Sequence, residues 1–226
     1  MRLYHPQMSD SIAWHENKVP VLVAENSRLF MLFVNQLSMQ SEGEKGPFVL
    51  SYEYEPVDIA EHVIMIRDYL YLPVDDRKLQ NRFQTLLQSV VMHELQDRTA
   101  SLQREISEYL EQVCLHMDYP TAFSEGEYVL PLLKSLKLKP AIDGVTPLER
   151  LIQYMELYNG LIKDQIFVLV GAHAYFSDDE ISQLYKMAAY EKWHMLLIER
   201  YQPNHIDAEE IYLFDENLCE LRVDLS

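Results

Sequence analysis

The chain of 226 residues has few cysteines and few glycines, and its glycines are not arranged to hold a phosphate. The two cysteines, Cys114 and Cys219, cannot form a disulfide framework or a zinc site alone, so we expect both to be buried thiols. None of the six glycines belongs to a G-x-x-x-x-G-K-[ST] motif, and the nearest pair, Gly43 and Gly46, lacks its spacing. We therefore expect neither ATP hydrolysis through such a loop nor a bound nucleotide cofactor.

Long hydrophobic runs and the common enzyme signatures are missing as well. No apolar run approaches the roughly 20 residues needed to cross a bilayer, and charged residues between Arg2 and Lys18 replace a signal-peptide core. We therefore expect a cytoplasmic protein with no membrane partner. The sequence has no G-x-S-x-G elbow, no H-E-x-x-H, no paired C-x-x-C and no D-x-[DN]-x-[DN]-G calcium loop. Nothing in it predicts an enzyme.

Positive charge is scarce, with 19 Lys and Arg against 36 Asp and Glu and a formal net charge of −17. This balance argues against nucleic acid, because affinity for DNA comes largely from cations that replace condensed counterions. The simplest interpretation is a solvated acidic surface that keeps the protein soluble. The alternative is that basic residues gather on one face. Two clusters could do so: Arg77, Lys78 and Arg82 near the start of one predicted helix, and Lys134, Lys137 and Lys139 near the end of another.

The part of the chain from residue 165 to 199 has the pattern of a strand, a capped helix and a second strand. Residues 166–170 form a continuous apolar run typical of a buried parallel strand, and Ser177 lies three residues before Glu180, as in a capping box. Residues 194–198 form the second buried run. Such a unit usually belongs to a doubly wound sheet, whose ligands lie at the carboxyl ends of the strands. Here those ends carry Gly171, Ala172 and His173, and Glu199 and Arg200.

The N-terminal part is also mixed. A hairpin over residues 2–5 and 11–15, a buried strand over 19–24, a helix capped by Asn26 or Ser27, and strands at 48–50 and 62–66 are expected.

The middle of the chain has helical periodicity. One long helix is expected over residues 79–95 and a second over 102–117; a third spans about 127–138, and Thr146 caps a fourth. We therefore predict an α/β fold with a mostly parallel sheet. Its head is formed by residues 1–73 and 164–226, and residues 74–163 form an inserted α-helical leg subdomain.

Three acids, Asp118, Glu125 and Glu127, occupy a short connection between two predicted helices. Calcium takes six to eight oxygen ligands from carboxylates, carbonyls and water, so a loop of this kind can hold it. The ordinary alternative is that acids are common at helix ends, where Glu127 would favour a helix N-terminus. A magnesium-dependent nuclease using these carboxylates is a further alternative. His173 could be an acid-base group or, more simply, a loop histidine satisfied by the backbone.

The order of several segments resembles a known family, the subtype II-A CRISPR-associated spacer-acquisition protein. The resemblance covers essentially the whole chain, and its strength is the order of the segments together with the length. The segments that carry it are residues 21–26, 62–69, 167–180, 194–199 and 212–220.

The resemblance implies a degenerate P-loop-NTPase-like head without a working phosphate loop, and a helical leg. It implies calcium-stabilised homotetrameric rings whose positive channel encircles double-stranded DNA without reading its sequence and loads at free ends. The protein would then be a non-catalytic factor in spacer acquisition, alongside the CRISPR integrase and the RNA-guided nuclease. In this family, acids at the helix junction serve calcium, which implies that role for Asp118, Glu125 and Glu127. Lys134, Lys137 and Lys139 are the first channel candidates, and Arg77, Lys78 and Arg82 the second. The rivals are a nucleotide-dependent enzyme or metal nuclease on the same head, and a protein-binding scaffold.

Overall fold

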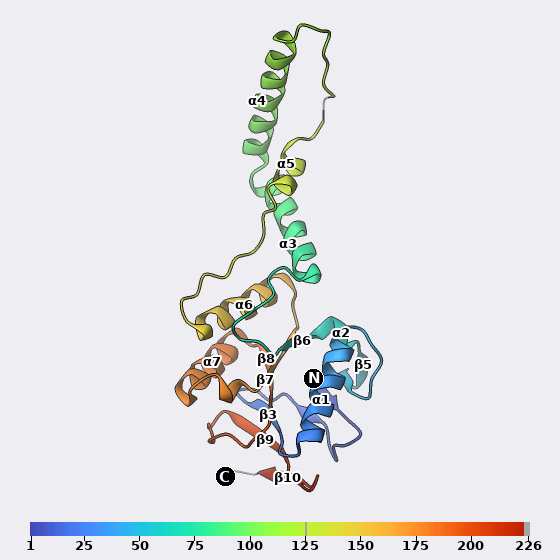
Figure 1. Cartoon of the computed structure of the whole chain (residues 1–226), viewed down its shortest axis with the longest axis vertical. Helices are drawn as coiled ribbons and strands as arrows, with labels where there is room; N and C mark the ends of the chain where they lie inside the picture. Colours follow the sequence, from blue (N-terminus) through green and yellow to red (C-terminus); the bar gives the residue numbers. More distant parts are fainter. Residues whose placement is uncertain (125, 224–226) are drawn as a thin grey trace. The chain divides into compact units, whose positions relative to one another are not determined.

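The computed structural model describes residues 1–124 and 126–223, and the chain divides into two compact units (Figure 1). Unit 1 consists of Met1–Leu72 and Ile142–Ser226, and unit 2 of Pro73–Ala141. The first boundary falls at 72/73, beside the expected 73/74. The second falls at 141/142, well before the expected 163/164, so the helical unit is shorter than predicted.

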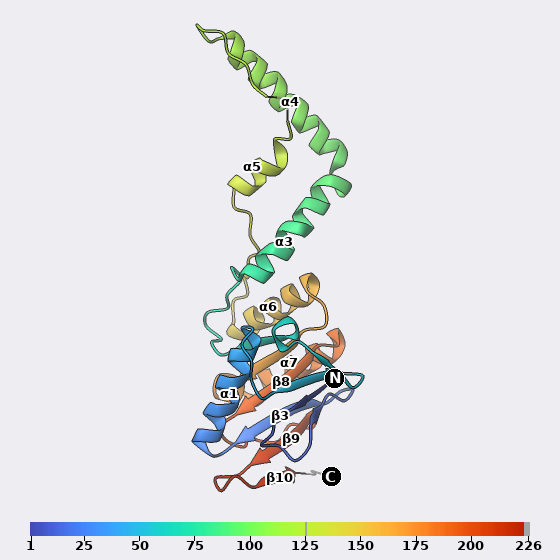
Figure 2. The ribbon, with the colours of Figure 1, turned by 90° about the vertical axis from the view of Figure 1, so that its right-hand side faces the viewer.

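Unit 1 is built on an open sheet. The apolar runs predict four of its strands, those that begin at Val19, Val63, Ile166 and His194, but not the two that begin at Glu209 and Glu220. Within the described residues the order of its six strands is β10-β9-β3-β8-β7-β6. All neighbours are parallel except β9 and β10, which confirms an α/β fold with a mostly parallel sheet. Figure 2 shows β8, β3, β9 and β10 following one another across it. The strands are β3 (Val19–Ala24), β6 (Val63–Ile66), β7 (Ile166–Val170), β8 (His194–Glu199), β9 (Glu209–Phe214) and β10 (Glu220–Val223).

Helices cover both faces of this sheet. The side chains of a strand alternate between the two faces, so a continuous apolar strand places apolar side chains on both. Leu22, Val168 and Ile198 belong to the core beneath helix α1 (Ser27–Ser41). On the other face, Tyr185 of helix α7 (Asp178–Glu191) reaches Glu209, and Figure 1 shows α1 and α7 on opposite sides of the strands. Both faces of the sheet are therefore shielded from solvent, as expected for continuous apolar strands.

The helix starts follow the predicted caps. Asn26, not Ser27, caps α1, and its Oδ1 accepts from the backbone N–H of Arg28 and of Leu29 at 3.0 and 3.2 Å. Ser177 with Glu180 caps α7, and a second capping box begins helix α6, with Thr146 and Glu149 as its partners; α6 spans Pro147–Leu161.

Helix α6 is the reason that the second boundary differs from the prediction. Leu151, Tyr154 and Met155 of this helix are buried, and α6 packs against α7. The predicted amphipathic face is present, but it belongs to the core of unit 1 and not to the leg.

A second, antiparallel sheet of order β2-β1-β4-β5 adds to the α1 side of unit 1. It contains the predicted hairpin of β1 with β2, and its Leu3, Ile12 and Leu50 join the core around Phe33. His62 is the last residue of the short helix α2 (Ile59–His62), so β6 starts one residue later than expected. The strands are β1 (Arg2–Tyr4), β2 (Ile12–Ala13), β4 (Val49–Tyr52) and β5 (Glu55–Val57).

Unit 2 is helical. Its elements are α3 (Arg77–Ser89), a π-helix (Val90–Glu94), α4 (Gln96–Leu115) and α5 (Val129–Ser135). The single long helix expected over 79–95 therefore ends at Ser89. The backbone N–H of Leu95 then donates to the carbonyl of Val90 at 2.9 Å, a spacing of five residues that defines the π turn.

Two further findings concern single residues and membranes. Cys219 is exposed, so the expectation that both cysteines are buried is wrong for it, and Cys114 is half-buried. Cys219 lies in the tight turn before β10, where its backbone N–H donates to the Asp215 carboxylate at 2.8 Å, and this turn keeps it at the surface.

Every helix among the described residues is too short or too polar to span a bilayer.

Candidate nucleic-acid interface

The first predicted basic cluster lies at the start of α3. Asp76 is the N-cap, and its carboxylate oxygens accept from the backbone N–H of Lys78 at 3.2 Å and of Leu79 at 3.3 Å. This cap fixes where the helix begins and therefore where Arg77 and Lys78 lie. The side chains of Arg77 and Arg82 are exposed.

The second cluster lies where α5 ends. Lys134 occupies the last turn of this helix, and Lys137 has a left-handed backbone conformation with φ of 51°, which carries the chain away from the helix axis. Lys139 follows in the connection, and all three side chains are exposed. The cluster therefore presents exposed ammonium groups on flexible side chains to solvent, which suits phosphates better than base edges.

One hydrogen bond brings the two clusters onto neighbouring segments. Gln84 of α3 donates from Nε2 to the carbonyl of Leu138 at 3.3 Å, and Leu138 lies between Lys137 and Lys139 in the sequence. The segment after α5 therefore runs beside α3. Arg77 lies seven residues before Gln84 and hence on nearly the same face of the helix, whereas Arg82 lies about half a turn around it. The sequence could not show this, because 54 residues separate the bonded pair.

Five of these cations are not neutralised by the part of the chain that the structure describes. Its ion pairs have His15, Arg67, His173 and His205 as their basic partners. In a chain with a net charge of −17, the five form a local excess of unpaired positive charge; they are Arg77, Arg82, Lys134, Lys137 and Lys139.

Two of the predicted calcium ligands, Asp118 and Glu127, are not brought together. Gln103, in α4, holds the returning chain by both ends of its amide: Nε2 donates to the carbonyl of Gly126, and Oε1 accepts from the N–H of Tyr128 at 3.0 Å. Glu127 therefore lies beside the middle of α4. Asp118 follows the end of the helix at Leu115, which is twelve residues beyond Gln103 or about 18 Å along the axis.

The third expected ligand, Glu125, lies outside the described residues. Among the residues that are described, no three His, Cys, Asp or Glu side chains are grouped so that they could hold a metal ion. As placed within one chain, Asp118 and Glu127 do not fit a calcium site. Calcium binding stays a prediction, and no step of the function is derived through it.

The turn between β3 and α1 lies at the carboxyl ends of the strands, where a doubly wound sheet usually binds its ligand. The first free N–H groups of a helix are a ready site for phosphate, but here Asn26 accepts from two of them. The amide of Asn26 also donates to the carbonyl of Glu216 at 3.0 Å, which holds it in place. The helix start is therefore occupied by the chain's own side chain.

A buried polar network begins near the same edge, at Glu199, the last residue of β8, and extends to Glu209, the first residue of β9. His173 donates its backbone N–H to Glu199 at 3.2 Å, and its Nε2 lies 3.0 Å from Oε1 of Glu209. The hydroxyl of Tyr185 donates to the same Glu209 oxygen at 2.8 Å. The idea that His173 is satisfied by backbone is therefore wrong, since its ring pairs with a carboxylate.

Burial determines the direction of the pKa shift of Glu199, whereas neighbouring carboxylates determine that of His173. Burial raises the pKa of Glu199 to about 7, although the N–H groups of His173 and Ala172 and the charge of His173 oppose the rise. Burial alone would lower the pKa of His173, but the hydrogen bond to Glu209 and the charges of Glu199 and Glu209 raise it. Glu199 and Glu209 are each 4% exposed, so a substrate does not reach them and the network is part of the core.

The arrangement defines a class: an α/β protein in which a side chain of the protein itself caps the helix after β3, and whose helical unit carries cations that form no ion pair among the described residues. Residues 40–218 match the family described as "CRISPR-associated protein (Cas_Csn2)". The chain therefore belongs to the Csn2 family of type II-A CRISPR-associated proteins, which confirms the resemblance and gives it a role in a CRISPR system. A nucleotide-free ATP-binding cassette from an ABC transporter is also similar, at 12% identity and a TM-score of 0.43 over 94% of this chain and 83% of that chain. At that TM-score the likeness does not establish a common fold.

Proposed function

We propose that the protein is a non-catalytic factor in CRISPR spacer acquisition that binds double-stranded DNA as a homotetrameric ring, independently of sequence and from free ends. Its partners are the integrase and the RNA-guided nuclease of the same locus. The observation that carries the proposal is the set of unpaired cations on adjoining segments of unit 2, in a chain that belongs to a CRISPR-associated family.

The charge distribution supports binding through phosphates. Each lysine or arginine that contacts a phosphate releases a condensed counterion, and a closed ring would multiply the few cations of one subunit by the number of copies. The remaining acidic surface would repel DNA elsewhere. Binding should therefore be confined to one channel, strongly salt-dependent and indifferent to sequence.

Topology of the DNA provides the test of ring loading. The purified protein is incubated with a linear duplex and with a covalently closed circle of the same sequence, and binding is measured by gel shift and by sedimentation. A ring that loads at ends binds the linear form and binds the circle poorly. Equal affinity for both forms would rule out loading at ends.

Substitution of the lysines tests the surface itself. Replacing Lys134, Lys137 and Lys139 by glutamine should weaken binding to all sequences alike. The slope of log K against log salt should flatten by about 0.9 for each phosphate that the variant no longer neutralises. The matched control replaces three exposed cations of unit 1, Arg28, Lys45 and Lys163, by glutamine. If the slope flattens equally in both triple variants, the effect is one of net charge and the assigned surface is wrong.

The rival functions have their own measurements. Turnover of labelled duplex with magnesium or manganese, or of ATP, would identify an enzyme and defeat the non-catalytic proposal. A protein-binding scaffold would show no duplex binding at low salt, with or without calcium.

A further inference from the structure

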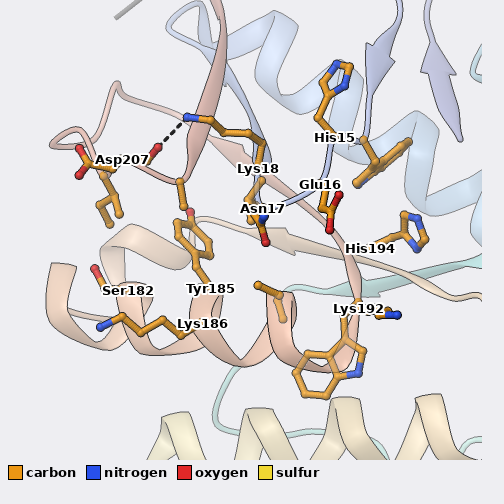
Figure 3. Close-up of a pocket in the computed structure, with 17 residues that line it drawn as sticks. His15, Glu16, Asn17, Lys18, Ser182, Tyr185, Lys186, Lys192, His194 and Asp207 are labelled. Carbon is orange, nitrogen blue, oxygen red and sulfur yellow. Dashed lines mark hydrogen bonds between the residues drawn. The ribbon is translucent and has the colours of Figure 1, made fainter. Parts of the chain in front are cut away.

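Unit 1 contains a cavity of about 690 Å³ at the edge of the sheet opposite to the Asn26 turn (Figure 3). Three neighbouring strands begin there: Val19 and His194 are the first residues of β3 and β8, and Ala208 directly precedes β9. The second half of α7 forms another wall. The volume is within the range of small-molecule sites, which is roughly 300 to 1,000 Å³.

The aromatic part of the wall is held rigidly from inside the protein. Trp14 donates from Nε1 to the carbonyl of Met195 at 2.6 Å, and Trp193 packs edge-on against Phe167 with ring centroids 6.0 Å apart. Tyr185 is fixed by its bond to Glu209. These rings need no reordering to accept a flat ligand, which lowers the entropic cost of binding.

The residues that line the cavity carry more positive than negative charge, whereas the whole chain is negatively charged. Three lysines line the cavity, against two acids. One of these acids, Asp207, turns its carboxylate fully into solvent, 4.0 Å from His205. Glu16 is then the remaining acid of the lining, so the cavity is cationic in a protein with nearly twice as many acids as bases.

The cations differ in how well they can receive an anion. Lys192 follows the carboxyl end of α7, where the helix dipole is negative and offsets part of its charge. Lys186 lies one turn beyond Ser182 on α7, and Lys18 is held over the cavity by a bond from Nζ to the Asp207 carbonyl at 2.7 Å. Figure 3 shows Lys18, Ser182 and Lys186 toward one end of the cavity and His194 and Lys192 toward the other. The anionic end of a ligand therefore belongs with Lys18, Ser182 and Lys186.

We propose that this cavity binds a nucleoside monophosphate unit, with its phosphate at Lys18, Ser182 and Lys186 and its base against Trp14 and Trp193. The missing phosphate loop does not bear on this, because that loop would lie at the opposite edge of the sheet and the proposal involves binding without hydrolysis. The unit could come from a free nucleotide or from the 5′ end of a single strand.

The chain has two tryptophans, and both line the cavity, so intrinsic fluorescence reports on it directly. AMP added to the full-length protein should change this fluorescence saturably. Adenosine, which lacks the phosphate, should bind about tenfold more weakly, because a hydrogen bond to a charged group contributes about that factor. Lys186→Gln should weaken AMP binding by a similar factor. Lys186 is exposed and forms no ion pair within the described residues, so folding is not at risk.

Lys137→Gln in unit 2 is the matched control and should leave AMP binding unchanged. A short 5′-phosphorylated single strand is the second ligand: tighter binding than AMP, with the same weakening in Lys186→Gln, identifies a strand end as the source, and weaker binding identifies the free nucleotide. The proposal is overturned if millimolar AMP causes no saturable change, or if adenosine and AMP bind equally and Lys186→Gln has no effect. Because the DNA surface proposed above is in unit 2, either proposal can fail without the other.

Discussion

Replacing Glu199 by glutamine should remove most of the pH dependence of the stability of unit 1 between pH 4.5 and about 7. Glu199 ends β8, is 4% exposed, and has its pKa raised by burial from 4.5 to about 7. A carboxyl with a raised pKa in the folded state keeps a proton that the unfolded chain releases. Its contribution to stability is therefore complete below pH 4.5 and is lost as the pH rises through about 7.

The magnitude follows from the same two values. At about 1.4 kcal/mol for each pH unit, the interval from 4.5 to about 7 corresponds to roughly 3 kcal/mol. His173 acts in the same direction, because its pKa is also raised and its contribution is also lost as the pH rises through the folded value. Together they predict that the wild-type unit 1 is markedly less stable at pH 8 than at pH 5.

Urea denaturation followed by tryptophan fluorescence is the appropriate assay, since Trp14 and Trp193 both belong to unit 1. Glutamine at position 199 can still accept the N–H of His173, but its own amide hydrogens lack a known acceptor, so absolute stability will fall. The slope against pH is therefore the readout. In the variant, the loss of unfolding free energy over this pH range should be smaller by roughly 3 kcal/mol, and the remaining loss is the part due to His173.

Glu156→Gln, on an exposed position of α6, is the matched control and should give a curve parallel to the wild type. If Glu199→Gln also runs parallel to the wild type, Glu199 is already ionised in the folded protein at low pH. The reasoning from burial would then be wrong.

Three further predictions concern the cap of α6, a contact within unit 2, and calcium. Thr146→Ala removes the N-cap of α6 and should destabilise unit 1 by about 1 kcal/mol in the same denaturation assay, and no change would mean that the capping box contributes nothing. Gln103→Ala removes both bonds that hold the chain at Gly126 and Tyr128, so hydrogen exchange in that segment should accelerate while α4 stays protected; unchanged exchange would show that other contacts hold it. A chelator should convert a tetramer to smaller species in sedimentation if calcium holds copies together. An unchanged mass would contradict the calcium prediction.

The sequence predicted those elements whose signals are local. The apolar runs of β3 and β7 and the capping boxes of α6 and α7 depend on residues within one turn or one strand, and the structure has them where the pattern indicates. Periodicity identified α6 as amphipathic but could not say which core its apolar face joins, and this moved the second boundary.

The contacts that were missed are all distant in sequence. His173 and Tyr185 meet Glu209 across 36 and 24 residues, and the bond that joins the basic clusters spans 54. A single sign was available beforehand, since Glu209 and Glu210 directly precede the apolar run from Ile211 to Phe214 within the same strand. A buried carboxylate at such a place requires partners, and these partners could have been sought among the histidines and tyrosines.

Unit 1 contains buried polar groups that are paired within the fold, whereas the cations assigned to DNA binding in unit 2 are exposed. In unit 1, Asn26 satisfies the start of α1, Glu209 is paired with His173, and Glu199 accepts backbone N–H groups, so these polar groups stabilise the fold. In unit 2, Lys137 and the cations around it that form no ion pair among the described residues contribute little to stability by position alone. Changes at the buried charges Glu199 and His173 of unit 1 should therefore alter the pH dependence of unfolding and leave the salt slope of DNA binding intact. Charge changes near Lys137 should do the reverse, and a lysine variant in unit 2 that changed both would show that the two units do not act separately.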